Sequence, residues 1–218
     1  MRKTLFLTTL IILIVNFVSA QSTRFGFYAG PVAANMFQKV GGVKHNSDYV
    51  MGATIGILLD VPMQKHGSFQ PGLNYVGKNS KDEFEQGGQT IKTKTILSYV
   101  ELPLNVLFRL PGGGGGNFTL GAGVAPAIAL DGVRTTTDAS NNKEDKDLSF
   151  GDGTSDDFGK YDFGINALAG YEFKNGFFVT LNYNYGINRL FVGGDPKDKL
   201  YNRYLALRAG FLIGGRKK

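Results

Sequence analysis

The sequence predicts an all-β fold: an eight-stranded antiparallel up-and-down transmembrane β-barrel. Three observations predict it. After residue 20, eight segments alternate apolar residues with small or polar ones, and a period of two is the spacing of a strand with two unlike faces. Short and long connections alternate between these segments. Many of the 31 glycines fall on the small or polar face, which suits the narrow interior of an eight-stranded barrel.

The first twenty residues have the features of an export signal. A basic start is followed by an apolar stretch and by a small-residue site that ends at Ala20, as in secretory signal peptides. We expect cleavage before Gln21, so residues 1–20 form a signal peptide and residues 21–218 form the barrel domain. An uncleaved membrane anchor is the alternative, but the apolar run is short for a span of about 20 residues.

Composition excludes several classes of site. The chain has no cysteine, which rules out disulfides, thiolate metal sites and a cysteine nucleophile. The formal net charge of +6 is spread along the 218 residues rather than gathered in a basic patch, so we expect no nucleic-acid partner.

The first three segments cover 24–34, 49–60 and 68–78. Their apolar faces alternate with glycine, threonine or amide residues, and consist of Phe25, Phe27, Ala29 and Pro31, then Tyr49, Met51, Ala53, Ile55, Ile57 and Leu59, then Phe69, Pro71, Leu73 and Tyr75. The prolines count against central strands because proline cannot donate to the hydrogen-bond ladder. A bulge at each proline would reconcile them with a sheet.

The fourth and fifth segments, 91–110 and 118–130, follow the same rule. The start of the fourth is too polar for lipid and is interpreted as a strand that continues into external water. The lipid-facing residues are Val100, Leu102, Leu104, Val106 and Phe108, then Phe118, Leu120, Ala122, Val124, Pro126 and Ile128.

The last three segments cover 161–173, 177–188 and 203–213. Their apolar faces carry Phe163, Ile165, Ala167, Ala169 and Tyr171, then Phe177, Val179, Leu181, Tyr183 and Tyr185, then Leu205, Leu207, Ala209, Phe211 and Ile213. The seventh segment shows the cleanest alternation of the eight.

The connection lengths give the barrel an orientation. The second, fourth and sixth connections are short, whereas the others are longer and hydrophilic, and 131–160 is the longest. Bacterial barrels have short periplasmic turns and long outer loops, so eight strands place both termini in the periplasm. We interpret 131–160 as a solvated mobile loop. A ten-stranded variant, with an extra hairpin inside that loop, is the alternative.

Five charged residues fall on the face assigned to the lumen: Glu101, Arg109, Asp162, Glu172 and Arg208. Charges in a narrow interior must be paired and hydrogen-bonded, because an uncompensated one costs several kcal/mol. We predict a structural polar network with Glu101 and Arg208 as members of an internal ion-pair cluster. A narrow conductance path is the alternative interpretation.

Several runs of residues resemble the PorT-like outer-membrane β-barrel domain family of Bacteroidetes. They are Phe25 to Gly30, Tyr99-Val100-Glu101-Leu102-Pro103-Leu104, Asp162 to Asn166, Gly170 to Phe173 and Leu205 to Phe211. The resemblance covers essentially the whole mature chain, and its most specific element is the Tyr-x-Glu-x-Pro-Leu run. It implies a barrel in the outer membrane and says little about activity, because a fold does not determine a function.

A search for chemistry along the chain gives no catalytic residue, no cofactor site and no metal site. The only histidines, His45 and His66, fall in an outer loop and a periplasmic turn, too far apart to share a site. The acidic residues of the long loop do not match the spacing of a calcium-binding loop. They are Asp145, Asp147, Asp152, Asp156 and Asp157.

We therefore expect a non-enzymatic outer-membrane barrel with a structural or surface-interaction role. Its expected partners are outer-membrane lipid and a surface ligand or protein that meets the outer loops. Two alternatives stay open: a narrow pore or small-solute transporter, and a soluble lipocalin-like ligand-binding barrel in the periplasm. The last requires the apolar faces to point inward.

Overall fold

The computed structural model describes residues 23–63, 65–153, 155–192, 195 and 197–215. The predicted signal peptide, residues 1–20, lies outside the described residues. Twelve strands and one short 3₁₀ turn make up the fold: β1 (Arg24–Val40), β2 (Val43–Asn46), β3 (Asp48–Pro62), β4 (Gly67–Gly77), β5 (Ser80–Gln86), β6 (Gln89–Glu101), β7 (Leu104–Pro111), η1 (Gly113–Gly115), β8 (Asn117–Thr137), β9 (Lys143–Asp147), β10 (Tyr161–Glu172), β11 (Phe177–Gly186) and β12 (Lys199–Gly214).

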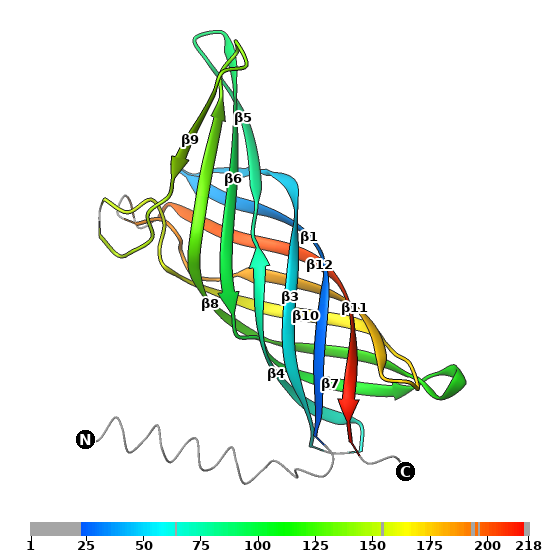
Figure 1. Ribbon diagram of the computed structural model, residues 1–218. Coiled ribbons are helices and arrows are strands. Elements are labelled where there is room, and N and C mark those ends of the chain that lie inside the picture. The colour runs from blue at the N-terminus through cyan, green and yellow to red at the C-terminus, as the bar shows by residue number, and fades with distance from the viewer. Residues whose placement is uncertain (1–22, 64, 154, 193–194, 196, 216–218) are drawn as a thin grey trace, which may run out of the picture.

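The strands form one antiparallel sheet that closes on itself (Figure 1). Pairing runs from β1 through β3, β4, β7, β8, β10, β11 and β12, and β12 returns to β1 along a register that joins Arg24 to Gly214. The start of β1 and the end of β12 therefore lie at the same end of the ring. The prediction of an all-β antiparallel barrel is confirmed.

The fourth predicted strand, 91–110, was expected to be continuous, and the structure divides it. β6 ends at Glu101 and β7 begins at Leu104. Pro103 lies in this gap, where the missing amide hydrogen of proline does not interrupt a ladder. Both halves lie between β4 and β8, so the break bends the wall without opening it.

The long outer connections contain strands that the alternation did not predict. β5, β6, β8 and β9 project beyond the ring at the end opposite the start of β1 and the end of β12, and this end is called the outer end (Figure 1). Connection 131–160 is not a mobile loop throughout, because β8 continues to Thr137 and turns back as β9. This hairpin resembles the extra pair of the ten-stranded alternative, but β9 pairs with β8 and does not enter the ring.

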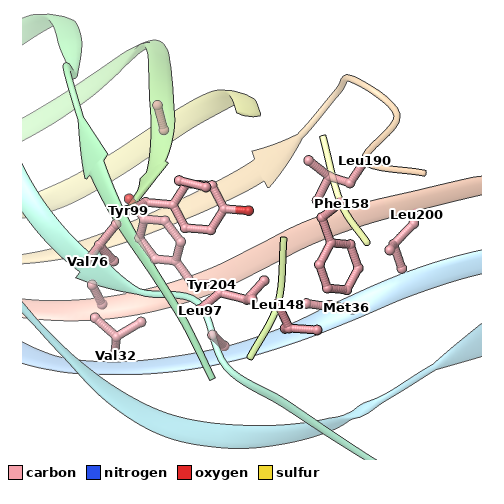
Figure 2. Packing of buried hydrophobic residues seen from close by; sticks show 14 residues of the cluster. Val32, Met36, Val76, Leu97, Tyr99, Leu148, Phe158, Leu190, Leu200 and Tyr204 are labelled. Carbon is pink, nitrogen blue, oxygen red and sulfur yellow. The ribbon is translucent and has the colours of Figure 1, made fainter. Parts of the chain in front are cut away.

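Alternation separates the two faces of the barrel wall. Apolar side chains on the outer face are exposed to an unusual degree, as with Ile55 at 61% and Leu207 at 50%. The buried hydrophobic cluster lies inside, toward the outer end, where Leu148, Phe158 and Leu190 from the outer connections cover the interior (Figure 2). Among the described residues no helix has the length and hydrophobicity of a membrane span.

Candidate functional site

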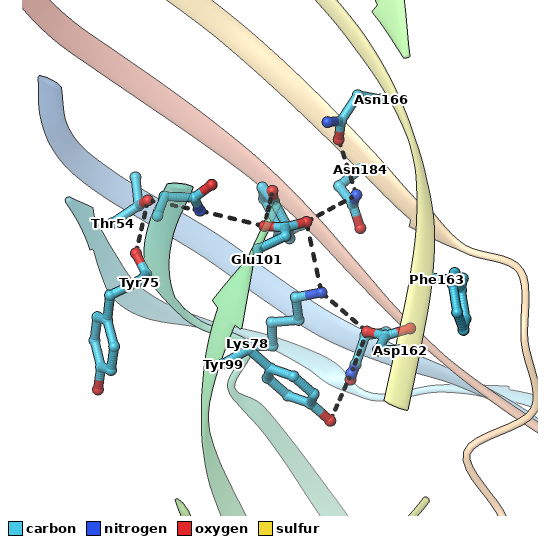
Figure 3. Close-up of polar contacts among 12 residues, drawn as sticks. Thr54, Tyr75, Lys78, Tyr99, Glu101, Asp162, Phe163, Asn166 and Asn184 are labelled. Carbon is cyan, nitrogen blue, oxygen red and sulfur yellow. Dashed lines mark hydrogen bonds and ion pairs between the residues drawn. The ribbon is translucent and has the colours of Figure 1, made fainter. Parts of the chain in front are cut away.

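The polar interior of the barrel is the candidate site, and its outer half is organised around Lys78. This lysine follows β4 and is 1% exposed. Its Nζ lies 2.9 Å from Asp162 Oδ2 and 3.9 Å from Glu101 Oε1 (Figure 3). The rings of Tyr99 and Tyr204 also lie beside the ammonium group, at 4.8 and 5.5 Å from Nζ to the centroids. One cation is thus shared between two buried carboxylates.

Hydrogen bonds from three strands, β4, β11 and β12, hold Glu101 in this cluster. The Tyr204 hydroxyl donates to Glu101 Oε2 at 2.9 Å. The side-chain amides of Asn74 and Asn184 donate at 3.3 and 3.4 Å. The second carboxylate, Asp162, accepts from Asn202 at 3.0 Å. Buried charge is tolerated where such donors satisfy it, so these contacts fix the position of the carboxylates.

A second cluster closes the half of the interior that lies nearer the start of β1. Arg109 Nη2 lies 2.7 Å from Asp60 Oδ1, and its Nε lies 3.0 Å from Glu172 Oε2. Arg24 pairs with the same two carboxylates, with 2.7 Å from Nη2 to Asp60 Oδ2. Arg109 also donates to the Ser68 hydroxyl at 2.6 Å. Two arginines and two carboxylates form a charge-balanced ring of alternating sign that ties β1, β3, β7 and β10 together.

Arg208 lies between the two clusters. Its guanidinium carbon lies 4.9 Å from the centroid of the Tyr28 ring, and its Nη2 donates to the Tyr204 hydroxyl at 3.3 Å. Arg208, Asn182 and Thr119 line an internal cavity of about 30 Å³, and each has a side-chain polar atom without a partner among the described residues. These polar atoms and the size of the cavity suit a buried water.

All five predicted lumen residues face the interior; four of them lie in the two clusters, and Arg208 lies between the clusters. Glu101 and Asp162 meet at Lys78, whereas Arg109 and Glu172 meet directly. Glu101 lies in an ion-pair cluster, whereas Arg208 makes no ion pair within 4.0 Å among the described residues and is linked to Glu101 through the Tyr204 hydroxyl.

Sequence reasoning missed three charged members of the interior: Arg24, Asp60 and Lys78. Each stands at the end of a predicted strand. Each has an even residue number, as do the other residues that face inward from that strand. Extending the alternation to the strand ends would have found all three.

The two histidines lie where the sequence predicted, at opposite ends of the molecule. His45 in β2 contacts Asp82 of β5, with 2.8 Å between Nε2 and Oδ1. The His66 ring in the β3–β4 turn lies 5.9 Å from the ring of Phe108. Among the described residues, no group of three or more histidine, aspartate or glutamate side chains is placed to hold a metal ion.

The tip of the β8–β9 hairpin depends on one carboxylate. Asp138 accepts hydrogen bonds from the backbone amides of Ser140 and Asn142, both at 2.8 Å, and from the Asn142 side chain at 2.9 Å. The Asn142 side-chain bond, then the backbone bonds, hold the pKa of Asp138 below its ordinary value of 3.8. The ionised form therefore stabilises the turn.

We expect this turn to loosen in acid. A lowered folded-state pKa gives stabilisation that is present above pH 3.8 and is lost as the pH falls through the folded value. NMR signals of the Ser140 and Asn142 amides are expected to titrate together with a midpoint below 3.8, and Asp138→Ala is expected to abolish the titration. A midpoint at or above 3.8 would contradict the assignment.

Comparisons with known proteins give a family and a fold. The family model described as outer membrane protein beta-barrel domain matches residues 19–192. Ail, the attachment invasion locus protein of Yersinia pestis, is 13% identical over 88% of this chain and 99% of its own, with a TM-score of 0.41. OprG from Pseudomonas aeruginosa is 12% identical over 89% and 98%, with a TM-score of 0.39. The outer membrane enzyme PagL is 14% identical over 84% and 99%, with a TM-score of 0.31. The comparison with curated proteins returns no match.

Proposed function

We propose that this chain, which belongs to the outer membrane protein beta-barrel domain family, is a non-enzymatic barrel that acts through its outer surface. The interior is filled by two ion-pair clusters and covered at the outer end by apolar side chains. The extended sheet of β5, β6, β8 and β9 stands beyond the ring. The observation that carries the proposal is this combination of a filled interior and a projecting outer sheet.

The proposal includes eight membrane crossings. β1, β3, β4, β8, β10, β11 and β12 each make one crossing, and β6 with β7 makes the remaining, broken one. Support comes from the pairing, since β6 and β7 share the same two neighbours. With both ends of the barrel domain 21–218 in the periplasm, the projecting sheet lies outside the cell. Within the family, the Tyr99–Leu104 run favours the PorT-like branch of Bacteroidetes.

Single-cysteine labelling tests this orientation, since the chain itself has no cysteine. Glu85→Cys places one exposed thiol in β5, and Lys174→Cys places a matched one in the β10–β11 turn. In intact cells a membrane-impermeant maleimide is expected to label Glu85→Cys alone, with Lys174→Cys labelled after the outer membrane is permeabilised. The reverse pattern would overturn the proposed orientation.

A narrow pore is the second candidate, favoured by the buried polar residues of the interior, such as Asp162, Asn166 and Glu172. The paired charges argue for the filled state, because moving an ion through them requires breaking buried ion pairs. We expect the purified chain in planar bilayers to give no stable unitary conductance. Regular single-channel steps that change after Arg109→Ala would favour the pore instead.

The soluble lipocalin-like alternative needs apolar side chains around an internal ligand. Here the large exposed hydrophobic residues lie on the outer face of the described wall, while two clusters of paired charges occupy the interior. A membrane barrel is expected to need detergent or lipid to fold and to migrate faster on gels when unheated. Refolding to a monomer in plain buffer would support the soluble alternative.

A further inference from the structure

Three lysines form a row across β2, β1 and β12 near the outer end of the barrel. Lys44 is directly opposite Lys39, and Lys39 is directly opposite Lys199. Side chains opposite one another on one face of a sheet have Cβ atoms about 5 Å apart, and like charges in such pairs are destabilising. The fold therefore holds three positive charges side by side.

The described part of the chain does not neutralise this row. None of the ion pairs within 4.0 Å among the described residues includes Lys39, Lys44 or Lys199. Asp198, the residue before Lys199, accepts a hydrogen bond from the Gly41 amide at 3.0 Å. A cluster of like charges without an internal counter-charge attracts an external anion.

A layer of aromatic rings lies next to the row on the same face. Phe37 and Tyr201 stack in parallel with centroids 6.2 Å apart, and Tyr185 lies 6.1 Å from Tyr201. Arg203 adds a fourth cation, because its guanidinium carbon lies 5.4 Å from the Phe37 centroid and its Nη2 donates to Asn46. Aromatic side chains of this kind mark the boundary between hydrocarbon and headgroups.

The height of the lysine row along the barrel axis agrees with the depth at which lipid headgroups lie. Exposed apolar residues of β1 begin at Phe25, and Phe37 lies twelve residues further along the same face. At about 3.3 Å per residue and a tilt of about 40°, this distance spans roughly 30 Å along the barrel axis, close to the hydrocarbon thickness of a bilayer. Lys39 is then about 5 Å beyond the hydrocarbon boundary, by the same rise and tilt.

We propose that Lys39, Lys44 and Lys199 bind the phosphate group of an anionic lipid in the outer leaflet, with Arg203 beside it. The aromatic layer would contact the upper acyl chains, while the lysines neutralise the headgroup. A lipid is favoured over a soluble anion because the row continues directly into the apolar face of the barrel. The inference rests on the proposed membrane placement and adds a lipid class to it.

A fluorescent reporter tests the site at its own depth. Since the chain contains no tryptophan, Phe37→Trp gives a single reporter in the aromatic layer. The mature chain is folded into phosphatidylcholine vesicles that contain a minor fraction of brominated lipid, either phosphatidylglycerol or phosphatidylcholine. We expect brominated phosphatidylglycerol to associate more than about tenfold more strongly, since each lysine near an anionic surface contributes about fivefold.

Matched charge changes locate the effect. Lys39→Gln, Lys44→Gln and Lys199→Gln together are expected to reduce the preference for phosphatidylglycerol to about fivefold or less, the contribution of the one remaining cation, Arg203. Lys92→Gln, Lys94→Gln and Lys143→Gln remove the same charge from β6 and β9 and are expected to leave the preference unchanged. Excess inorganic phosphate, at matched ionic strength, is expected to leave it unchanged as well.

Each other outcome overturns the inference in a different way. Equal quenching by the two brominated lipids refutes the lysine site but leaves the membrane barrel intact. An unquenched reporter refutes the membrane placement itself. Loss of preference in the control triple variant shows a general charge effect, and displacement by inorganic phosphate shows a site for soluble anions.

Discussion

Replacing Lys78 with methionine is expected to lower the free energy of unfolding by about 3–5 kcal/mol. This is the cost of removing one partner of a buried ion pair, because the other partner is left as an unpaired buried charge. Methionine keeps the volume of the side chain but leaves Asp162 and Glu101, both 0% exposed, without their common cation. The measurement is urea unfolding in lipid vesicles, followed by loss of the fast-migrating folded band.

Two further variants separate charge from packing. Adding Asp162→Asn to Lys78→Met removes one of the two stranded charges, so we expect at least half of the lost stability to return. Lys81→Met removes an exposed lysine that pairs with Glu83 at 2.6 Å, and we expect no measurable change because surface pairs contribute little. Unchanged stability of Lys78→Met would show that the outer cluster does not hold the barrel together.

Gly30→Ala is expected to prevent normal closure of the barrel. A Cβ at Gly30 would lie 1.8 Å from the backbone oxygen of Leu207 on β12. β1 and β12 are the first and last strands, and their pairing closes the ring. Because the obstructing atom belongs to the backbone, relief requires the strands to separate. Overpacking commonly costs 1–3 kcal/mol, and here we expect about 3 kcal/mol or more, seen as a lower folded fraction in vesicles.

Gly67→Ala is the matched control for this effect. Gly67 also lies in a wall strand, as the first residue of β4, but a Cβ there meets no atom nearer than 4.0 Å. The same added methyl group is therefore expected to leave the folded fraction unchanged. If Gly30→Ala and Gly67→Ala fold equally well, the prediction is wrong, and β1 and β12 can separate enough to admit a methyl group.

The period-two alternation of apolar and polar residues predicted much of the architecture. It predicted the antiparallel barrel and the inward face that carries Glu101 and Asp162. It also contained the signal for Lys78 and Asp60, which have the inward parity of their strands. The pattern failed in the projecting hairpins: β5 and β9 have polar residues on both faces, since water surrounds them, so the contrast between faces disappears.

The sequence by itself determined which side chains face inward, because the alternation of a strand is a local property of the backbone. Only the tertiary structure decided which inward residues meet. The relative stagger of neighbouring strands brings Lys78 to Asp162, and it places the Tyr204 hydroxyl between Arg208 and Glu101. Stagger in a closed ring depends on all strands together, so no single segment contains it.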